Sequence, residues 1–366
     1  MNESFPRIPI YRPNLTGNEK RYVDDCLASS WISSKGAYIE KFETAFSQFT
    51  SNRHCISVCN GTVALHVALL ALGIGPGDEV IVPTFTYIAS ANAITYTGAR
   101  PVFVDSLRDT WQMDPNDVRE KITPRTKAIL CVHLYGHPCD LQSLRKIADS
   151  ENIFLVEDCA EALGSKFNDI HVGNVGDIAT YSFYGNKTVT TGEGGMVATN
   201  DAALASRAIH LKGQGLANNR EYWHDVIGYN YRMTNICAAI GLAQLERVDA
   251  ILKQKRQVAK AYQFFLEATG FEVHSEAKNV RHSYWMVSVL VPESARRDSI
   301  RSYLSGAGIE TRPAFYPIHK MPMYAQHNEL HRVAEDISER GINLPSFPDL
   351  ESSDIERIAN ALKQAV

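Results

Sequence analysis

A lysine lies in a glycine-rich loop between two strand-like runs. Lys187 follows Asp177–Phe183 and precedes Gly195–Thr199, and both flanks are rich in β-branched and aromatic residues, as strands are. The loop's glycines permit backbone conformations that are closed to other residues and allow a ligand to approach closely. Partial desolvation in such a loop lowers a lysine's pKa and exposes a nucleophilic amine. A solvated lysine in a glycine-rich turn fits this stretch equally well.

A second candidate lies upstream, where His54–Gly73 has the pattern of a strand, a tight turn and an apolar helix. Asn60 suits the N-cap position, which leaves the backbone N–H groups of Gly61 and Thr62 free at the helix N-terminus. Free donors and the helix dipole both favour an anion, so this start is suited to phosphate. An ordinary capped core helix is the alternative interpretation.

Short apolar runs then alternate with segments of helix length. The runs are Glu79–Pro83, Pro101–Asp105, Ala128–Leu134 and Ile153–Glu157, and the helical segments are Tyr87–Thr97, Pro115–Lys121 and Leu141–Ser150. This order predicts an α/β domain whose mostly parallel sheet is covered on both faces. In such sheets ligands lie at the carboxyl ends of the strands. Tyr87, the loop His133–His137 and the acidic run Glu157–Glu161 all follow strand ends, on the same rim as Asn60 and Lys187.

The length of 366 residues predicts more than one domain. We expect a large domain over residues 1–244 and a smaller α+β domain over residues 245–366. The second would begin with a long amphipathic helix, roughly Leu245–Ala268, which Gly270 would end as a C-cap. A strand at Tyr284–Val291, a helix near Ser299–Ser305 and a final helix from Ser353 would complete it.

The composition is that of an ordinary globular protein, with 21% charged and 45% hydrophobic residues. No apolar run is long enough to cross a bilayer and no signal-peptide pattern is present, so we expect a cytoplasmic protein without membrane contact. Seven cysteines without a C-x-x-C pair indicate reduced thiols. A net charge of −4, with no basic stripe or helix-turn-helix pattern, argues against nucleic-acid binding and against a regulatory DNA-binding protein.

Several common cofactor motifs are absent from the sequence. Gly73–Gly77 lacks the spacing of a dinucleotide-binding loop, and Asn186 stands where a Walker A loop requires glycine before Lys187. A zinc site can be imagined from Cys131, His133, His137 and Cys139. Because a strand running into a proline-containing loop scatters these side chains, we expect no metal site.

The remaining candidates form a set that one cofactor requires. Pyridoxal phosphate needs an amine for a Schiff base, a phosphate cradle, a partner for ring stacking and a carboxylate for the pyridine nitrogen. Lys187, the Asn60–Thr62 turn, Tyr87 and Asp158 supply these four groups. Each is weak alone, but together in one α/β domain they predict a pyridoxal-phosphate enzyme.

The sequence also resembles a known family, the nucleotide-sugar aminotransferases, over nearly its whole length. The segments that carry the resemblance are 60–62 (Asn-Gly-Thr), 83–87 (Pro-Thr-Phe-Thr-Tyr), 157–161 (Glu-Asp-Cys-Ala-Glu), 182–187, 191–195 (Thr-Gly-Glu-Gly-Gly) and 229–234 (Tyr-Asn-Tyr-Arg-Met-Thr). Four further segments, 31–36, 184–188, 222–225 and 340–346, are similar to the perosamine-forming members. Many relatives carry His-Pro where this chain has Tyr184-Gly185, and perosamine-forming members depart from that pair in the same way. The departure leaves open what contacts the amino-acid substrate there.

The resemblance implies an aspartate-aminotransferase-like (fold type I) large domain, a homodimer with shared active sites or a larger assembly, and a cycle through pyridoxamine phosphate. It assigns Lys187 as the Schiff-base lysine and general acid/base and Asp158 as the partner of the pyridine nitrogen. The implied cofactor contacts are Tyr87 on the ring, Glu161 near its phenolic oxygen, Gly61, Thr62 and Ser182 at the phosphate, and Asn230 at the phosphate of the neighbouring subunit.

The implied substrates are L-glutamate and a GDP-linked 4-keto-6-deoxy sugar, whose aminated product serves surface-polysaccharide (O-antigen) synthesis. For the sugar nucleotide the loops offer only candidates: Trp31, Ser33, Arg232, Tyr316 and His319. Arg232 suits a diphosphate because guanidinium pairs well with phosphate oxygens. The alternatives are another nucleotide-linked 4-keto sugar and a related sugar dehydratase, in which a histidine replaces the lysine.

Overall fold

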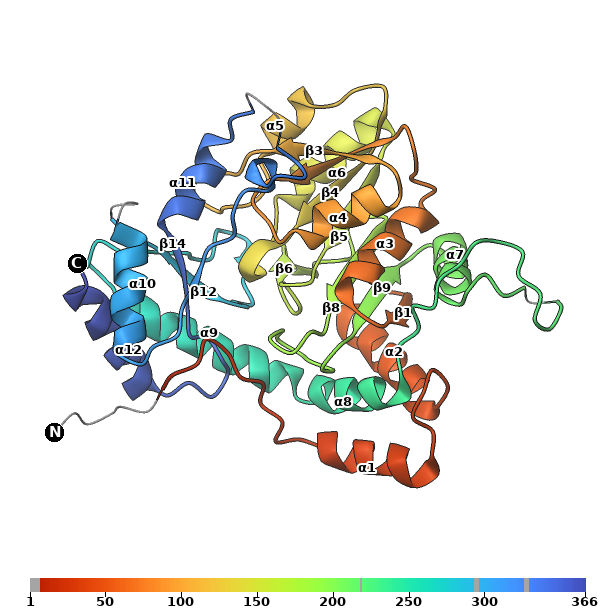
Figure 1. The fold of residues 1–366 in the computed structure, drawn as a ribbon, viewed down its shortest axis with the longest axis horizontal. Helices are drawn as coiled ribbons and strands as arrows, with labels where there is room; N and C mark the ends of the chain where they lie inside the picture. Colours follow the sequence, from red (N-terminus) through yellow and green to blue (C-terminus); the bar gives the residue numbers. More distant parts are fainter. Residues whose placement is uncertain (1–6, 218, 293–295, 326–328) are drawn as a thin grey trace.

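The computed structural model describes residues 7–217, 219–292, 296–325 and 329–366 (Figure 1). Its centre is a seven-stranded sheet in the order β1-β9-β8-β5-β4-β2-β3. In chain order these strands are β1 (His54–Val58), β2 (Glu79–Pro83), β3 (Arg100–Val104), β4 (Thr126–Val132), β5 (Phe154–Asp158), β8 (Ile178–Ser182) and β9 (Gly195–Thr199). Most of their residues are buried, as expected for a sheet covered on both faces.

Only β9 runs against the other strands of this sheet. It pairs antiparallel with both β8 and β1, whereas the pairs β5–β8, β4–β5, β2–β4 and β2–β3 are parallel. Two reversals restore the direction, so β1 points the same way as β8 although it lies at the far edge. The carboxyl ends of β1, β5 and β8 therefore meet on one rim, which confirms the predicted mostly parallel α/β sheet.

Helices cover both faces of the sheet (Figure 1). One face carries α3 (Gly61–Ala71), α4 (Ala89–Tyr96) and α7 (Ala202–Lys212), whose apolar residues share a core with the strands. The opposite core includes residues of α2 (Ala37–Thr50), α5 (Pro115–Glu120), α6 (Leu141–Glu151) and α8 (Asn235–Leu245). Outside this layer, α1 (Glu19–Ser29) packs along α8.

A smaller unit follows, built on a four-stranded sheet in the order β10-β12-β14-β13. Its strands are β10 (Glu272–Val273), β12 (Val287–Leu290), β13 (Arg312–Pro313) and β14 (Gly341–Leu344). Its helices are α9 (Val248–Phe265), α10 (Arg297–Gly306), α11 (Arg332–Arg340) and α12 (Ser352–Gln364). A small sheet, β11 (Val280–Arg281), β6 (Lys166–Phe167) and β7 (Ile170–His171), links this unit to the large one, and η1 (Leu134–Gly136) and η3 (Ile318–Lys320) are short 3-10 turns.

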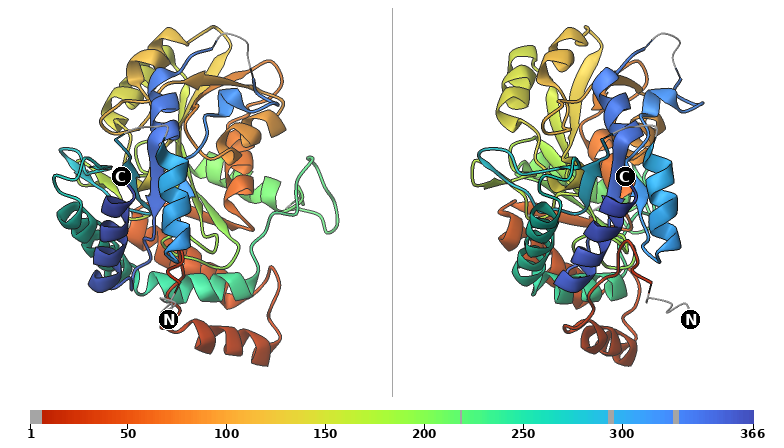
Figure 2. Two further views of the ribbon diagram at one scale, coloured as in Figure 1. Left: turned by 60° about the vertical axis from the view of Figure 1, so that its left-hand side comes forward. Right: turned by 90° about the vertical axis from the view of Figure 1, so that its left-hand side faces the viewer.

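Two details differ from the sequence expectations. The helix expected at Leu245–Ala268 is present but shorter: it is α9, Val248–Phe265, and a separate helix, α8, precedes it and ends at Leu245. The N-terminal arm, which the sequence placed in the large domain, packs on the smaller unit: Ile8 pairs with Ile309 and shares its core (Figure 2). None of the helices in the described ranges is long and apolar enough to cross a membrane.

Candidate active site

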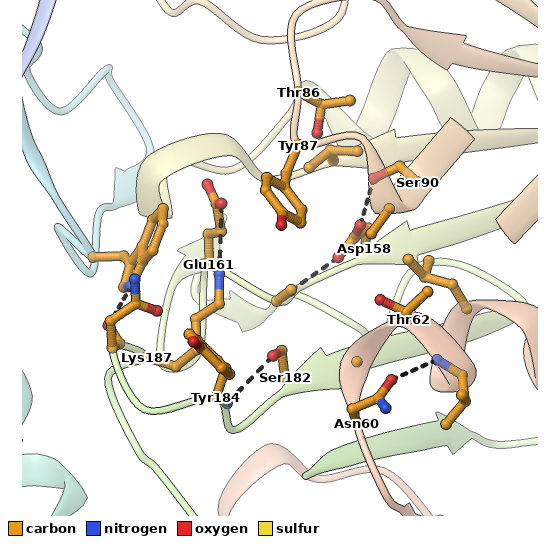
Figure 3. Close-up of a pocket in the computed structure, with 18 of the residues that line it drawn as sticks. Asn60, Thr62, Thr86, Tyr87, Ser90, Asp158, Glu161, Ser182, Tyr184 and Lys187 are labelled. Atoms are coloured by element: carbon orange, nitrogen blue, oxygen red, sulfur yellow. Dashed lines mark hydrogen bonds and ion pairs between the residues drawn. The ribbon is translucent and has the colours of Figure 1, made fainter. Parts of the chain in front are cut away.

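A cavity of about 510 Å³ opens where the carboxyl ends of β5 and β8 face the start of α3. Figure 3 shows Lys187, Glu161, Asp158, Ser182 and Tyr87 arranged around this space. The residues come from three separate segments of the chain, one after β2, one at the end of β5 and one at the end of β8. The sheet thus brings together five of the positions that the sequence nominated one by one.

Lys187 lies in the loop between β8 and β9, and only 13% of its side chain is exposed. Its Nζ is 3.6 Å from Glu161 Oε1 and 3.8 Å from the centre of the Trp285 ring. Burial lowers the pKa of this amine, although the carboxylates of Glu161 and Asp158 act in the opposite direction. The structure therefore favours the desolvated lysine over the solvated one that the sequence left open.

The loop's backbone is held at three points around this lysine. Lys187 N donates to the carbonyl of Tyr184, the Tyr11 hydroxyl donates to the Lys187 carbonyl at 2.9 Å, and Trp285 Nε1 donates to the Asn186 carbonyl at 2.7 Å. Tyr11 belongs to the N-terminal arm, and Trp285 lies just before β12 of the smaller unit. A glycine-rich loop would otherwise be free to move, so these bonds fix where the amine points.

Asp158 ends β5 with its carboxylate at the cavity. Oδ2 accepts a hydrogen bond from Ser90 Oγ at 2.9 Å and Oδ1 accepts one from Ala160 N at 3.1 Å. Burial raises the pKa of this carboxyl, while the two hydrogen bonds oppose that shift. A buried carboxylate fixed in this way is suited to holding a proton on a cationic ring nitrogen.

Glu161 lies across the cavity from Asp158 and accepts a hydrogen bond from Tyr135 N at 2.9 Å. Its side chain is 5% exposed, and burial raises its pKa to about 7, against the attraction of Lys187. A carboxyl that titrates near neutral pH can give or take a proton beside the amine.

The start of α3 forms the predicted anion site. Asn60 caps the helix by accepting from Val63 N at 3.0 Å, which leaves the first N–H groups of Gly61 and Thr62 to the cavity. A Cβ on Gly61 would lie 2.7 Å from Ser182 Cβ, so only glycine fits this close approach. Ser182 thereby faces the helix N-terminus, where donors and dipole favour a phosphate.

Aromatic rings enclose the opposite side of the cavity. Tyr87 is 58% exposed and its ring centre is 5.7 Å from that of Phe315. Trp285 is buried and stacks at 15° to Tyr135. Tyr87 is thus free to lie against a flat ring.

A buried pair supports the strand end that carries Asp158. His133 Nε2 donates to Glu157 Oε2 at 3.0 Å, and its Nδ1 accepts from Cys139 N at 3.0 Å. The sulfurs of Cys131 and Cys139 lie within 4.8 Å of an imidazole nitrogen, so the structure gathers three of the side chains that the sequence was expected to scatter. Because both ring nitrogens already have partners, the imidazole serves as a brace between β4 and β5.

The other nominated residues lie outside the cavity lining. Asn230 is exposed, and Trp31 is 57% exposed with Ser33 two residues further along the same turn. Arg232 pairs with Val58 at the end of β1, and its Nε is buried without a partner. Their roles at cofactor or substrate stay predictions.

Two nominated residues of the smaller unit also fail to reach the cavity. Tyr316 is 54% exposed beside Arg297, although its neighbour Phe315 lines the cavity. His319 is 3% exposed and bonds to Thr84 Oγ1 at 2.7 Å and Glu335 Oε1 at 3.2 Å. That internal network leaves His319 no path to a ligand in this conformation.

Ser90, Glu193 and Trp285 are among the lining residues that the sequence did not nominate. Ser90 follows Tyr87 by one helical turn, so the spacing itself could have suggested it. Trp285 stands next to β12, where the apolar pattern indicates only a strand.

A buried amine, an anchored carboxylate, a helix N-terminus and an open aromatic face in one cavity form the donor set that pyridoxal phosphate requires. Sequence comparison agrees with this set: residues 13–363 match the profile of the DegT/DnrJ/EryC1/StrS aminotransferase family. The chain belongs to this family. Pyridoxal phosphate is the cofactor of DegT/DnrJ/EryC1/StrS aminotransferases, and this member is an aminotransferase.

Relatives within the family are similar over almost their whole length. GDP-perosamine synthase of Escherichia coli O157:H7 is 58% identical, with 98% of each chain covered. The enzyme of the same name from Vibrio cholerae is 48% identical, covering 97% of this chain and 98% of the relative.

Solved structures of the family share the fold. DesV of S. venezuelae, determined with a ketimine intermediate, has a TM-score of 0.92 at 34% identity, with 98% of both chains covered. The sugar aminotransferase Spr1654 of Streptococcus pneumoniae in its PLP form has a TM-score of 0.93 at 28% identity, covering 99% of this chain and 98% of that one.

Proposed function

We propose that this enzyme transfers the amino group of L-glutamate to C4 of GDP-4-keto-6-deoxy-D-mannose, giving GDP-perosamine. The observation that carries the proposal is the 58% identity, over 98% of both chains, to a GDP-perosamine synthase. Two further enzymes of that name are 48% identical. We expect the product to serve surface-polysaccharide (O-antigen) synthesis.

The residues around the cavity would each have a separate role in this transfer. Pyridoxal phosphate, when bound, supplies the electron sink. The start of α3 and Ser182 would hold its phosphate, and Tyr87 would cover its ring. Asp158 would keep a proton on the ring nitrogen, because its carboxylate is fixed by Ser90 and Ala160.

Lys187 would move the proton between the substrate carbon and the cofactor. Its amine is desolvated, which favours the neutral, proton-accepting form, and Glu161 lies 3.6 Å away to take up or return a proton. A dehydratase would carry histidine in place of this lysine, so Lys187 favours amino transfer over dehydration. The two half-reactions should give ping-pong kinetics.

A homodimer would complete the site, with Asn230 reaching the cofactor phosphate of the neighbouring subunit. Asn230 is exposed and lies outside this chain's own cavity. It ends a segment that projects from the body between α7 and α8 (Figures 1 and 2). On this segment Tyr222 is 92% and Ile227 is 87% exposed, with Trp223 and Val226 beside them. Exposed apolar clusters of this kind indicate a protein interface.

The enzyme would act in the cytoplasm. A nucleotide-linked sugar carries diphosphate charges that cannot enter a bilayer without a large desolvation cost. The enzyme must therefore share a compartment with the reactions that make its substrate.

The decisive experiment offers GDP- and dTDP-linked 4-keto-6-deoxy sugars to enzyme first treated with glutamate. Glutamate alone should change the absorbance of the bound cofactor, and the GDP-linked sugar should reverse that change faster than the dTDP-linked one. A preference for the dTDP-linked sugar would overturn the perosamine assignment and favour another 4-keto sugar. A spectrum that glutamate leaves unchanged would refute Lys187-centred amino transfer.

A further inference from the structure

Lys255 is a buried lysine outside the cavity. It lies on α9, and the residue is 1% exposed. Its Nζ donates to the Ser346 carbonyl at 2.6 Å and to the Trp285 carbonyl at 3.2 Å. The ring of Tyr11 lies 5.1 Å from the same atom. No described residue forms an ion pair with it, which is unusual for a buried lysine.

Burying the Lys255 amine without an ion-pair partner carries a large desolvation cost. Burial lowers the pKa of Lys255 to about 7, and no carboxylate offsets the shift. A hydrocarbon side chain would fill this position without that cost, so the retained amine indicates a specific task for its two hydrogen bonds.

The first of these bonds leads directly to the reactive amine. Trp285, whose carbonyl Lys255 binds, places its indole 3.8 Å from Lys187 Nζ and donates from Nε1 to Asn186 O. A shift of the Trp285 backbone would therefore move both the ring over Nζ and the loop beside it.

The second bond leads to the same loop by another route. Ser346, whose carbonyl Lys255 binds, accepts from Val287 N at its hydroxyl and donates from its N–H to the Ile10 carbonyl. The next residue of that arm, Tyr11, donates to the Lys187 carbonyl at 2.9 Å. Lys255 thus lies behind both contacts that reach the Lys187 loop from the smaller unit.

We propose that Lys255 is a positioning residue for Lys187: its Nζ holds the backbones of Trp285 and Ser346 where the indole covers Lys187 Nζ and Tyr11 holds the Lys187 carbonyl. The inference rests on the proposed role of Lys187 and is independent of which sugar nucleotide is used.

The test compares Lys255→Met, Trp285→Leu and the double variant as holoenzymes. Methionine keeps the length of the chain and removes the charge and the donors. The matched control is Tyr262→Phe, because Tyr262 lies two turns further along α9 and donates to the neighbouring Pro345 carbonyl at 3.0 Å without touching Trp285. The readouts are the pH midpoint of the bound cofactor's visible absorbance, and kcat and KM for glutamate.

A positioning role and a purely electrostatic role of Lys255 predict opposite shifts of the pH midpoint in Lys255→Met. An indole face favours a cation, so losing its fixed place should lower the midpoint, by about 0.5 to 1 pH unit. Removing a nearby positive charge would instead raise it. Glu161 and Asp158, the charged groups that face Lys187, are unchanged in all variants.

We expect Lys255→Met to lower the midpoint and to reduce kcat about tenfold with little change in KM, and the double variant to resemble Trp285→Leu. Tyr262→Phe should keep the wild-type midpoint. An unchanged or raised midpoint in Lys255→Met, or full additivity in the double variant, would overturn the proposal. If Lys255→Met does not fold, Lys255→Gln, which keeps a shorter donor, should show a smaller downward shift, and no shift would count against the proposal.

Discussion

Replacing Glu161 by glutamine should stabilise the cofactor-free protein at alkaline pH while it impairs the enzyme. Burial raises the pKa of this carboxyl from 4.5 to about 7, so the folded protein binds its proton more tightly than the unfolded chain. The contribution of this carboxyl to stability is therefore greatest below pH 4.5, falls as pH rises from 4.5 to 7, and stays lower above 7. The difference of roughly 2.5 pH units corresponds to about 3 kcal/mol at pH 8. The attraction of Lys187 is already contained in that pKa.

Glutamine has the same shape, can still accept from Tyr135 N and carries no charge, so it avoids this cost. Urea unfolding at pH 5, 6, 7 and 8 should show the variant's advantage growing from about 1 kcal/mol to about 3 kcal/mol. Over the same pH range the variant should turn over more slowly than the wild type, because it lacks the Glu161 carboxylate that accepts a proton beside Lys187. A constant difference in stability between pH 5 and pH 8 would show that Glu161 ionises normally and would refute the reasoning.

Three further predictions concern the cavity and the junction of the two units. Lys187→Ala should abolish turnover and leave no borohydride-fixed cofactor on the chain by mass spectrometry, and retained turnover would remove Lys187 from its role. Asp158→Asn should lower kcat/KM at least about 10²-fold while Tm changes little, and near-normal kinetics would contradict the assigned role. The pKa of His274 is lowered from 6.5 to about 3 by burial, so the fold loses stability as pH falls below 6.5 and the unfolded chain takes up the proton. Phenylalanine can keep the stack on Trp111, whose ring centre is 4.2 Å from that of His274. In thermal or urea unfolding, His274→Phe should therefore weaken the loss of stability on the acid side by about 1.4 kcal/mol per pH unit. An unaltered slope of stability against pH would argue against a buried neutral imidazole.

The large domain could be predicted well because its signals are local. Continuous apolar runs, such as Glu79–Pro83, have no polar face and so indicate strands covered on both sides. The Asn60 cap and the glycines around Lys187 carry their own backbone chemistry. Together they predicted the sheet and its ligand-bearing rim, with Asn60, Asp158 and Lys187 on it.

What the sequence could not supply depends on contacts between distant segments. Trp285 and Tyr11 lie 98 and 176 residues from Lys187 in the chain, and nothing in their local pattern points to it. His319 was nominated for its loop position, but its burial is set by Thr84 and Glu335.

The pairing of Ile8 with Ile309 has a consequence for how the chain folds. These residues are far apart in the chain, yet they share one core, and α12 packs in it too. Contacts of such long sequence separation carry a large loop-closure cost and slow folding. The N-terminal arm must therefore stay unpaired while the large domain forms, and docks only after the segment that carries Ile309 has been synthesised. Since Tyr11 belongs to that arm, the Lys187 loop would take its final shape at the last step of folding.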